Sequence, residues 1–197
     1  LDIETTYNYE EHESYFEDIL KYENPIICII GTIINNDSLI YKDFTIKYLT
    51  NEEEKKIISY WIDYLYKKFK KQIIKVYHWG YAEENYINYM KHKYKDLVFP
   101  EFEMINLLKY FQLEPITIKG CFNYSLKTIV KQLYNLKLID NTWGDVTTAL
   151  DALIELKDKS SKAKYKNIPI KRYVEIKRII YYNYVDCLVL NDILKLL

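Results

Sequence analysis

Four residues near the two ends of the chain could together hold divalent metal ions. Asp2 and Glu4 are two positions apart, so both carboxylates point to the same face if their segment is a β-strand. Tyr182 and Asp186 are four positions apart and share one face of a helix. Mg²⁺ prefers carboxylate oxygens, and two such ions about 3.5–4 Å apart hydrolyse phosphodiesters. The spacing therefore predicts a magnesium site with this chemistry.

Each of these patterns is weak when taken alone. A chain with 28 acidic residues should contain about one Asp-x-Glu tripeptide by chance, and 22 tyrosines make an accidental Tyr-x-x-x-Asp easy to find. Asp186 carries more weight because its helical pattern is otherwise apolar, and a buried carboxylate needs a partner or a metal. Pairing with Lys177 or Arg178 is the alternative for Asp186.

A further set of polar residues follows the expected strand 73–79. Glu83 or Glu84 could supply another metal ligand, although acids in a first helical turn also simply favour the helix dipole. His78, at the strand end, could act as a general base, a metal ligand or a substrate contact. A half-buried structural histidine is the preferred interpretation of His78.

The chain reads as alternating strands and helices that bring these residues together. Thr50 and Glu53 form a capping-box pattern, and Ser125 is suited to cap a later helix. The expected strands are 1–5, 25–34, 39–49, 73–79 and 102–108, and the expected helices are 51–71, 82–93, 126–136 and 170–197. The order β-β-β-α-β-α-β followed by helices predicts one α/β domain, residues 1–197.

Composition restricts the class of protein. Apolar residues make up 49% and charged residues 28%, as in a globular domain, and no apolar run approaches the roughly 18 residues of a membrane span. Three separated cysteines without a CxxC motif favour free thiols in the cytoplasm or another reducing compartment. Low glycine and proline with abundant tyrosine, lysine and isoleucine are typical of an AT-rich genome, such as that of a bacterium or a large DNA virus.

Charge is distributed unevenly although the formal net charge is zero. Residues 1–24 contain eight acids against one lysine, a net charge of −7, and residues 157–178 contain nine bases against two acids, a net charge of +7. This asymmetry fits an acidic metal-binding pole and a basic phosphate-binding pole. A solvated lysine-rich loop is an equally good interpretation of the basic stretch.

Four segments in order resemble the DEDD 3′–5′ exonucleases of the tyrosine subgroup. More narrowly, the chain is similar to predicted ribonuclease H-like exonucleases related to the proofreading domain of family B DNA polymerases. The corresponding segments are LDIETT at 1–6, YHWGYAE at 77–83 and YNYVDC at 182–187. Pro115 and the segment KGCFNYSLK at 119–127 resemble the family's "P…KG…SLK" segment.

The resemblance implies a ribonuclease H-like fold, with a mixed central sheet whose first three strands are antiparallel and whose later strands are parallel, flanked by helices. It implies two Mg²⁺ or Mn²⁺ ions and a tyrosine that orients the attacking water. The implied metal ligands are Asp2, Glu4, Glu83 and Asp186, and the orienting tyrosine is Tyr182. Glutamate at position 83 stands where most relatives place aspartate, and Asn106 replaces another common aspartate.

The expected substrate is the single-stranded 3′ end of DNA or RNA. Expected substrate contacts are Thr5, His78, Trp79, Tyr124, Lys127 and Asn183. Trp143 and Phe122 are further aromatic residues that could stack bases, although aromatic residues more often belong to the core. Lys127 could contact a phosphate or could simply be a solvated lysine.

Other functions remain open at this level. A ribonuclease H-like nucleic-acid-binding module that has lost activity would show degraded motifs, whereas Asp2, Glu4, Tyr182 and Asp186 are intact. A structure-selective endonuclease would need a channel open at both ends, and a protein-interaction module would leave the carboxylates unexplained. Because the chain starts on an expected strand, we expect a domain excised from a longer protein, with a fused or associated helicase or nuclease module.

Overall fold

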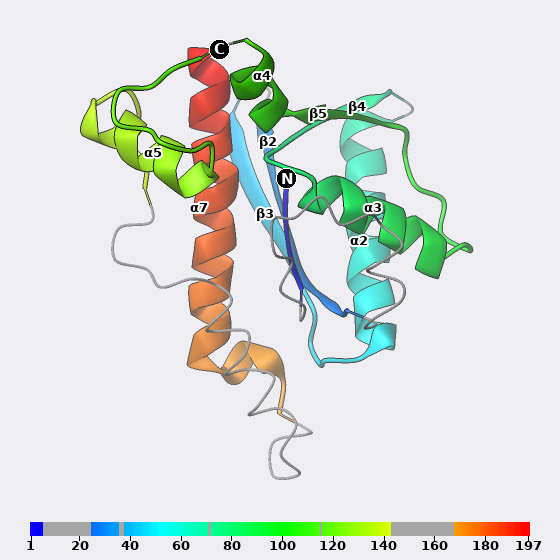
Figure 1. The fold of residues 1–197 in the computed structure, drawn as a ribbon. Coiled ribbons are helices and arrows are strands. Elements are labelled where there is room, and N and C mark those ends of the chain that lie inside the picture. The colour runs from blue at the N-terminus through cyan, green and yellow to red at the C-terminus, as the bar shows by residue number, and fades with distance from the viewer. Residues whose placement is uncertain (6–24, 36–37, 71, 115, 143–167) are drawn as a thin grey trace.

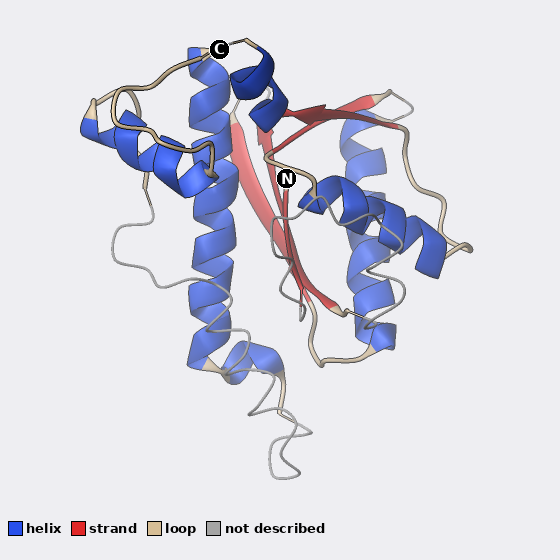
Figure 2. Ribbon diagram, in the orientation of Figure 1, coloured by secondary structure: helices blue, strands red, loops and turns tan. Residues whose placement is uncertain are grey.

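The computed structural model describes residues 1–5, 25–35, 38–70, 72–114, 116–142 and 168–197. The described residues form five strands. Figures 1 and 2 show these strands and the helices that flank them. The elements are β1 (Asp2–Thr5), β2 (Ile27–Asn35), β3 (Leu39–Thr45), α2 (Asn51–Phe69), β4 (Ile74–His78), α3 (Ala82–Lys93), β5 (Phe102–Asn106), α4 (Leu107–Leu113), α5 (Leu126–Asn135), a short 3₁₀ turn η1 (Ile170–Arg172) and α7 (Val174–Leu196). This confirms the predicted α/β class and the predicted order from β1 to β5.

The strands form two sheets. β1, β2 and β3 are antiparallel in that order, with Asp2 opposite Gly31, whereas β4 and β5 are parallel. β2 is almost wholly buried, as its continuous apolar run predicts. At the end of the antiparallel sheet next to β4, the amino group of Leu1 donates a hydrogen bond to the carbonyl of Tyr77 (3.2 Å).

Helices cover both faces of the antiparallel sheet. Figure 1 shows α7 on one side of β2 and β3, and α2 and α3 on the other. One apolar core lies under α2, α3 and β2, and includes Trp61 and Tyr89. A second core joins α4 and α5 to the C-terminal half of α7, and includes Ile129 and Val189. The long helix α7 therefore contributes side chains to both cores, and it also contacts β1.

Several predicted boundaries were wrong. The strand expected over 102–108 ends at Asn106, whose side chain accepts a hydrogen bond from the amide of Leu108 and so caps α4. The strand expected over 39–49 ends at Thr45, and the last helix begins at Val174 rather than at 170.

The predicted helix caps formed with one difference. Thr50 and Ser125 both accept from backbone amides three residues later, at Glu53 and Thr128. The Glu53 carboxylate accepts from the amide of Lys47, so it anchors the preceding loop instead of closing a reciprocal capping box.

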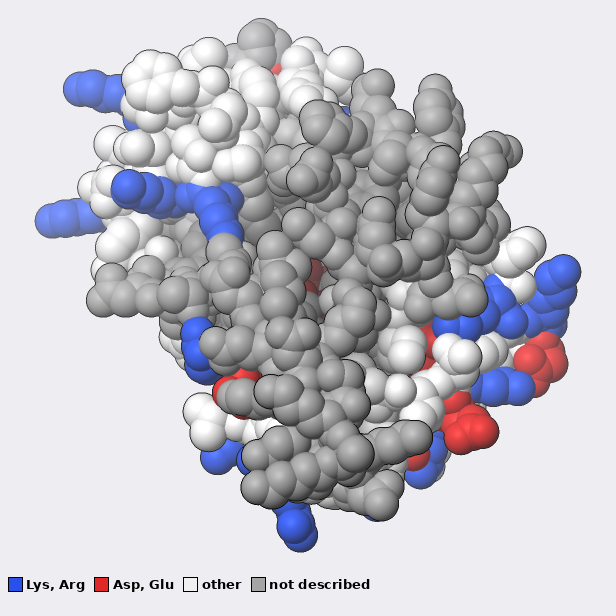
Figure 3. Space-filling view, turned by 60° about the horizontal axis from the view of Figure 1, so that its bottom comes forward, with Lys and Arg blue, Asp and Glu red and all other residues white. Residues whose placement is uncertain are grey.

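The predicted charge asymmetry falls mostly outside the described residues, which omit 6–24 and 143–167. On the face in Figure 3, lysine and arginine side chains of the described residues lie along both flanks and do not form one patch. Among the described residues, no helix is both long and apolar enough to cross a lipid bilayer. All three cysteines (Cys28, Cys121 and Cys187) are free thiols.

Candidate metal centre

Three of the predicted ligands meet where β1 and α7 cross. Asp2, Glu4 and Asp186 each offer a carboxylate oxygen, and these oxygens lie within 4.8 Å of one another. The alternation of the strand explains part of this, because Ile3 points into the core while Asp2 and Glu4 point to the other face. α7 packs against β1 and β2 and brings Asp186, which is buried, to the same place.

Asn183 holds the Asp2 carboxylate in position. Its side-chain amide donates to Oδ2 of Asp2 at 2.7 Å and to the Asp2 carbonyl at 3.2 Å. On its other side, Oδ1 of Asn183 accepts a hydrogen bond from the Tyr41 hydroxyl at 2.9 Å. Asn183 is fully buried, so its amide is engaged with the protein, and the predicted contact of Asn183 with substrate stays a prediction.

Gly31 makes room for this arrangement. It lies opposite Asp2 in the strand register, directly below the Asn183 amide. A Cβ atom at position 31 would come within 1.6 Å of Oδ1 of Asn183. The Asn183 amide would have to move away from its present position to avoid this clash. Sequence analysis missed both Gly31 and Tyr41. A glycine inside an otherwise β-branched strand is the signal that could have identified Gly31, because it marks a close approach.

Glu83 extends the acidic site from the first turn of α3. It is buried, and its Oε2 has no hydrogen-bond partner among the described residues. Burial, followed by the charge of Asp2, raises the pKa of Glu83 to about 8. The charge of Glu83 also raises the pKa of Glu4. The neighbouring Glu84 is only half-buried, whereas Glu83 is buried. Glu83 is thus the acid of this pair that faces the cluster, although it lies outside the 4.8 Å group.

The two carboxylates of β1 act on each other, because Glu4 lowers the pKa of Asp2 through a hydrogen bond while Asp2 raises the pKa of Glu4. Burial raises the pKa of Asp2 to about 6, against the opposing effects of the Leu1 amino group and the Asn183 hydrogen bond. Burial also raises the pKa of Glu4 well above its usual value, and the neighbouring charges of Asp2 and Glu83 raise it further. Lys127 acts in the opposite direction on Glu4.

Tyr182 and Lys127 lie beside the carboxylates. Burial raises the pKa of the Tyr182 phenol, and the charges of Asp186, Glu4 and Asp2 raise it further, in that order. The phenol is therefore protonated at neutral pH and can donate a hydrogen bond but not act as a base. The Lys127 ammonium, on an exposed side chain of α5, lies 5.3 Å from the centre of the Tyr182 ring.

Two predicted substrate contacts are buried behind the carboxylates. His78 is fully buried, its Nδ1 lies 3.8 Å from Oε2 of Glu83, and burial lowers its pKa to about 4. His78 is therefore neutral at pH 7 and more deeply buried than predicted. Thr5 is also buried and shares a 3.0 Å hydrogen bond with the Tyr86 hydroxyl. Contact of either residue with substrate stays a prediction.

The two aromatic residues predicted to stack on bases are linked to each other. The indole of Trp79 donates to the carbonyl of Tyr124 at 3.1 Å, and its ring packs against Phe111. This hydrogen bond connects the segment after β4 to the loop before α5, and Lys127 lies in the first turn of α5. Phe122, in the same loop, is 97% exposed, whereas Trp143 lies outside the described residues.

Asn106, which replaces a common aspartate of the family, has a structural role here. Its Oδ1 accepts from the amide of Gly80 at 3.2 Å and from the amide of Leu108 at 3.1 Å. The side chain therefore connects the ends of β4 and β5.

Comparison of the chain with protein-family models, curated proteins and solved structures found no match. What the site can do must therefore be argued from its own geometry.

The residues present fit a divalent cation. Asp2, Glu4 and Glu83 form no salt bridge with a lysine or arginine of the described residues, although the charges of the Leu1 amino group and of Lys127 lower the pKa values of Asp2 and Glu4. The donor atoms are carboxylate oxygens, the ligands that Mg²⁺ and Mn²⁺ favour. A cation among them would stabilise the ionised carboxylates, whose pKa values burial raises.

Proposed function

We propose that this chain is a metal-dependent 3′–5′ exonuclease that hydrolyses phosphodiester bonds of DNA or RNA. The observation that carries the proposal is the group of carboxylates from β1 and α7, within 4.8 Å of one another, at a site that also contains a tyrosine and a lysine.

Asp2, Glu4, Glu83 and Asp186 would hold two Mg²⁺ or Mn²⁺ ions. When bound, such ions polarise the phosphate, lower the pKa of water and stabilise the leaving oxygen. The chain's own residues fix the ligands for this task. Asn183 orients the Asp2 carboxylate, and the burial of Glu83 keeps water from competing for its oxygens.

Tyr182 and Lys127 would act on the substrate. The protonated Tyr182 hydroxyl can donate a hydrogen bond that orients either the attacking water or a phosphate oxygen. Lys127, on the open side of the site, can pair with the phosphate next to the scissile bond. Tyr124 and Trp79, joined by their hydrogen bond, border the loop along which the strand would leave.

We also propose that the fold is ribonuclease H-like. The element order supports this, and so does the hydrogen bond from the Leu1 amino group to Tyr77, which brings the start of β1 beside β4. Joining the two sheets at this point would give the order β3-β2-β1-β4-β5, with Asp2, Glu4 and the end of β4 at one place.

The test uses single strands of DNA and of RNA labelled at either end, with Mg²⁺ or with EDTA. A 3′–5′ exonuclease releases labelled mononucleotide at once from the 3′-labelled strand and leaves a ladder of shortening products from the 5′-labelled strand. Both reactions should stop in EDTA and in the Asp2→Asn variant.

Three results would contradict the proposal. Cleavage of a circular single strand would indicate an endonuclease, and metal-independent binding without cleavage would indicate an inactive binding module. Equal rates for the wild-type chain and Asp2→Asn would exclude the assigned site.

A further inference from the structure

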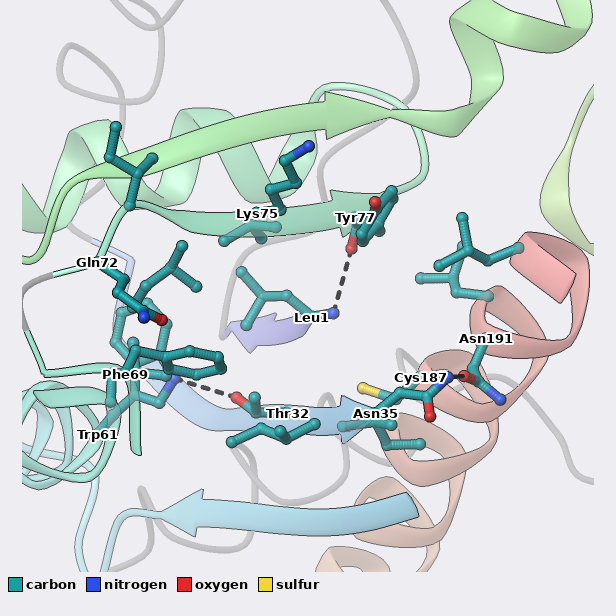
Figure 4. A pocket seen from close by; sticks show the side chains of 18 residues that line it. Leu1, Thr32, Asn35, Trp61, Phe69, Gln72, Lys75, Tyr77, Cys187 and Asn191 are labelled. Carbon is teal, nitrogen blue, oxygen red and sulfur yellow. Dashed lines mark hydrogen bonds between the residues drawn. The ribbon is translucent and has the colours of Figure 1, made fainter. Parts of the chain in front are cut away.

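Near the ends of β4 and β5, four buried side-chain atoms have no hydrogen-bond partner among the described residues. They are Nδ1 and Nε2 of His78, Oε2 of Glu83 and Nδ2 of Asn106. None of these three residues lines the cavity of about 440 Å³ between β2 and β4 that Figure 4 shows. Leaving a buried polar atom unpaired is costly, so the position of all four in one place calls for an explanation.

The side-chain amide of Asn106 has a defined orientation. Its Oδ1 accepts from the amides of Gly80 at 3.2 Å and Leu108 at 3.1 Å, so Nδ2 is the donor that remains without a partner. His78 lies opposite Asn106 in the parallel register of β4 and β5. Side chains at such positions point to the same face of the sheet, so the Asn106 amide and the His78 imidazole are neighbours across the two strands.

The His78 imidazole also faces Glu83, in the first turn of α3. Nδ1 of His78 lies 3.8 Å from Oε2 of Glu83, about 1 Å longer than a hydrogen bond. A carboxylate that binds a cation is ionised and can only accept, so a hydrogen atom between these two atoms must belong to Nδ1. The competing partner of the ring is the backbone of Gly80, which raises the pKa of His78.

The four atoms match as two donor–acceptor pairs. In a neutral imidazole with its hydrogen on Nδ1, Nε2 is an acceptor. That nitrogen is then the acceptor that Nδ2 of Asn106 lacks, and Nδ1 is the donor that Oε2 of Glu83 lacks. The same assignment satisfies all four atoms, and it specifies one tautomer of His78.

We propose that His78 is a positioning residue that holds Glu83 for a metal ion. In the metal-bound state, Asn106 donates to Nε2 of His78, and Nδ1 of His78 donates to Oε2 of Glu83. The other oxygen of Glu83 is then left for the cation. His78 would thus do for Glu83 what the Asn183 amide does for Asp2. This inference rests on the proposed function, because it requires the metal site.

The first test measures Mn²⁺ affinity by calorimetry for the wild-type chain, His78→Phe, His78→Asn and Val76→Ala. Phenylalanine fills the space of the ring without a donor, whereas asparagine can place an amide donor near the position of Nδ1. Val76 is the control for lost packing, because it is buried on the same face of β4, two residues earlier. Urea denaturation shows that each variant folds.

We expect His78→Phe to lower Mn²⁺ affinity by about 10–100-fold, as for lost supporting contacts in other metal sites. His78→Asn should recover part of this loss, and Val76→Ala should keep the wild-type affinity although its urea midpoint falls. Equal affinity in the wild-type chain and His78→Phe, or equal losses in both His78 variants, would overturn the inference alone. A wild-type chain that binds no Mn²⁺ would overturn the metal centre and the inference with it.

A second test observes His78 directly by nitrogen NMR of its imidazole in Mg²⁺, in the wild-type chain and in Glu83→Ala. We expect the hydrogen on Nδ1 in the wild-type chain and a clear shift of the Nδ1 signal when Glu83 is removed. A hydrogen on Nε2 alone, or an Nδ1 signal that does not respond to Glu83→Ala, would assign the ring to the Gly80 backbone and overturn the inference.

Discussion

Buried Glu54 and the acids of the candidate metal centre, all among the described residues, lie in contrasting environments. Glu54, on α2, is 0% exposed and fully compensated: one oxygen accepts from the amide of Ile27 at 3.0 Å, and the other accepts from Lys93 at 2.6 Å and Tyr94 at 2.7 Å. This network ties α2, α3 and the start of β2 together. Every strong acceptor of Glu54 has a donor, so the residue needs nothing from outside.

The acids of the candidate metal centre are arranged differently. Oε2 of Glu83 has no hydrogen-bond partner among the described residues. Burial and the charge of Asp2 raise the pKa of Glu83 to about 8, and burial raises the pKa of Asp2 to about 6 although the Asn183 amide donates to it. The contrast teaches that the fold can neutralise a buried carboxylate when it serves stability, and that it leaves an oxygen of Glu83 without a donor among the described residues where we propose that a cation binds.

The largest effect is expected when one carboxylate is removed from the group formed by Asp2, Glu4 and Asp186. Asp186→Asn keeps the shape of the side chain but weakens the metal site, so we expect nucleotide release from a 3′-labelled strand to slow by about 10²–10³-fold. The control is Asp192→Asn on the same helix, where the carboxylate accepts from Asn141 and Lys195 outside the cluster. Similar losses in both variants would contradict a specific role for Asp186.

The complementary variant is Glu54→Ala. It leaves the half-buried Lys93 without its carboxylate partner and the buried Ile27 amide without its acceptor, so we expect the free energy of unfolding to fall by about 3–5 kcal/mol, measured by urea denaturation. The cleavage rate per folded molecule should not change. Glu53→Ala, one position earlier and bonded to the amide of Lys47, should cost less than about 1.5 kcal/mol. A large loss of cleavage in folded Glu54→Ala would erase the distinction between the two groups of acids.

Gly31→Ala tests whether the position of the Asp2 carboxylate depends on the space that Gly31 of β2 leaves for Asn183. The added methyl would displace the Asn183 amide and release Asp2, so we expect a loss of about 1–3 kcal/mol in stability. We expect metal affinity to fall by about 10–100-fold, as for lost supporting contacts in other metal sites.

The double variant Gly31→Ala/Asn183→Ala separates these two effects. Removing the amide relieves the clash and should restore part of the stability without restoring metal affinity. Recovery of both would show that Asn183 does not orient Asp2.

The dependence of stability on pH is a further difference between Glu54 and the acids of the candidate metal centre. The pKa of Glu83 rises from 4.5 to about 8 and that of Asp2 from 3.8 to about 6, so the folded state binds more protons than the unfolded state between these values. The stability present at low pH is therefore lost as pH rises through the folded-state pKa values, by at most about 1.4 kcal/mol per pH unit for each titrating group.

In urea denaturation without metal, the chain should be more stable at pH 5 than at pH 8. Mg²⁺ should restore stability at pH 8, and Glu83→Gln should flatten the slope. A slope of the opposite sign would mean that these acids are already compensated.

Much of the fold could be predicted from local patterns. The apolar run of β2, the cap at Ser125 and the Asp-x-Glu alternation depend only on neighbouring residues, and the structure bears out each of them. The end of β5 could not be placed, because an apolar sequence continues into α4 and only the capping side chain of Asn106 separates the two.

The candidate site was predicted less completely. The meeting of Asp2, Glu4 and Asp186 was anticipated, and the structure brings these three together. The roles of Gly31, Tyr41 and Asn183 depend on packing between elements distant in the sequence, and no local spacing reports such contacts. For the same reason, a compensated acid such as Glu54 cannot be told from an uncompensated one such as Glu83 before the fold is known.

The most direct test of the central claim is a calorimetric titration of Mn²⁺ at pH 8 into the wild-type chain, the Asp2→Asn/Asp186→Asn double variant and the Asp192→Asn control. If the acids of the candidate metal centre bind cations, the wild-type chain and the control bind up to two ions, and the double variant loses this binding while remaining folded. Equal Mn²⁺ binding by all three chains would contradict the account.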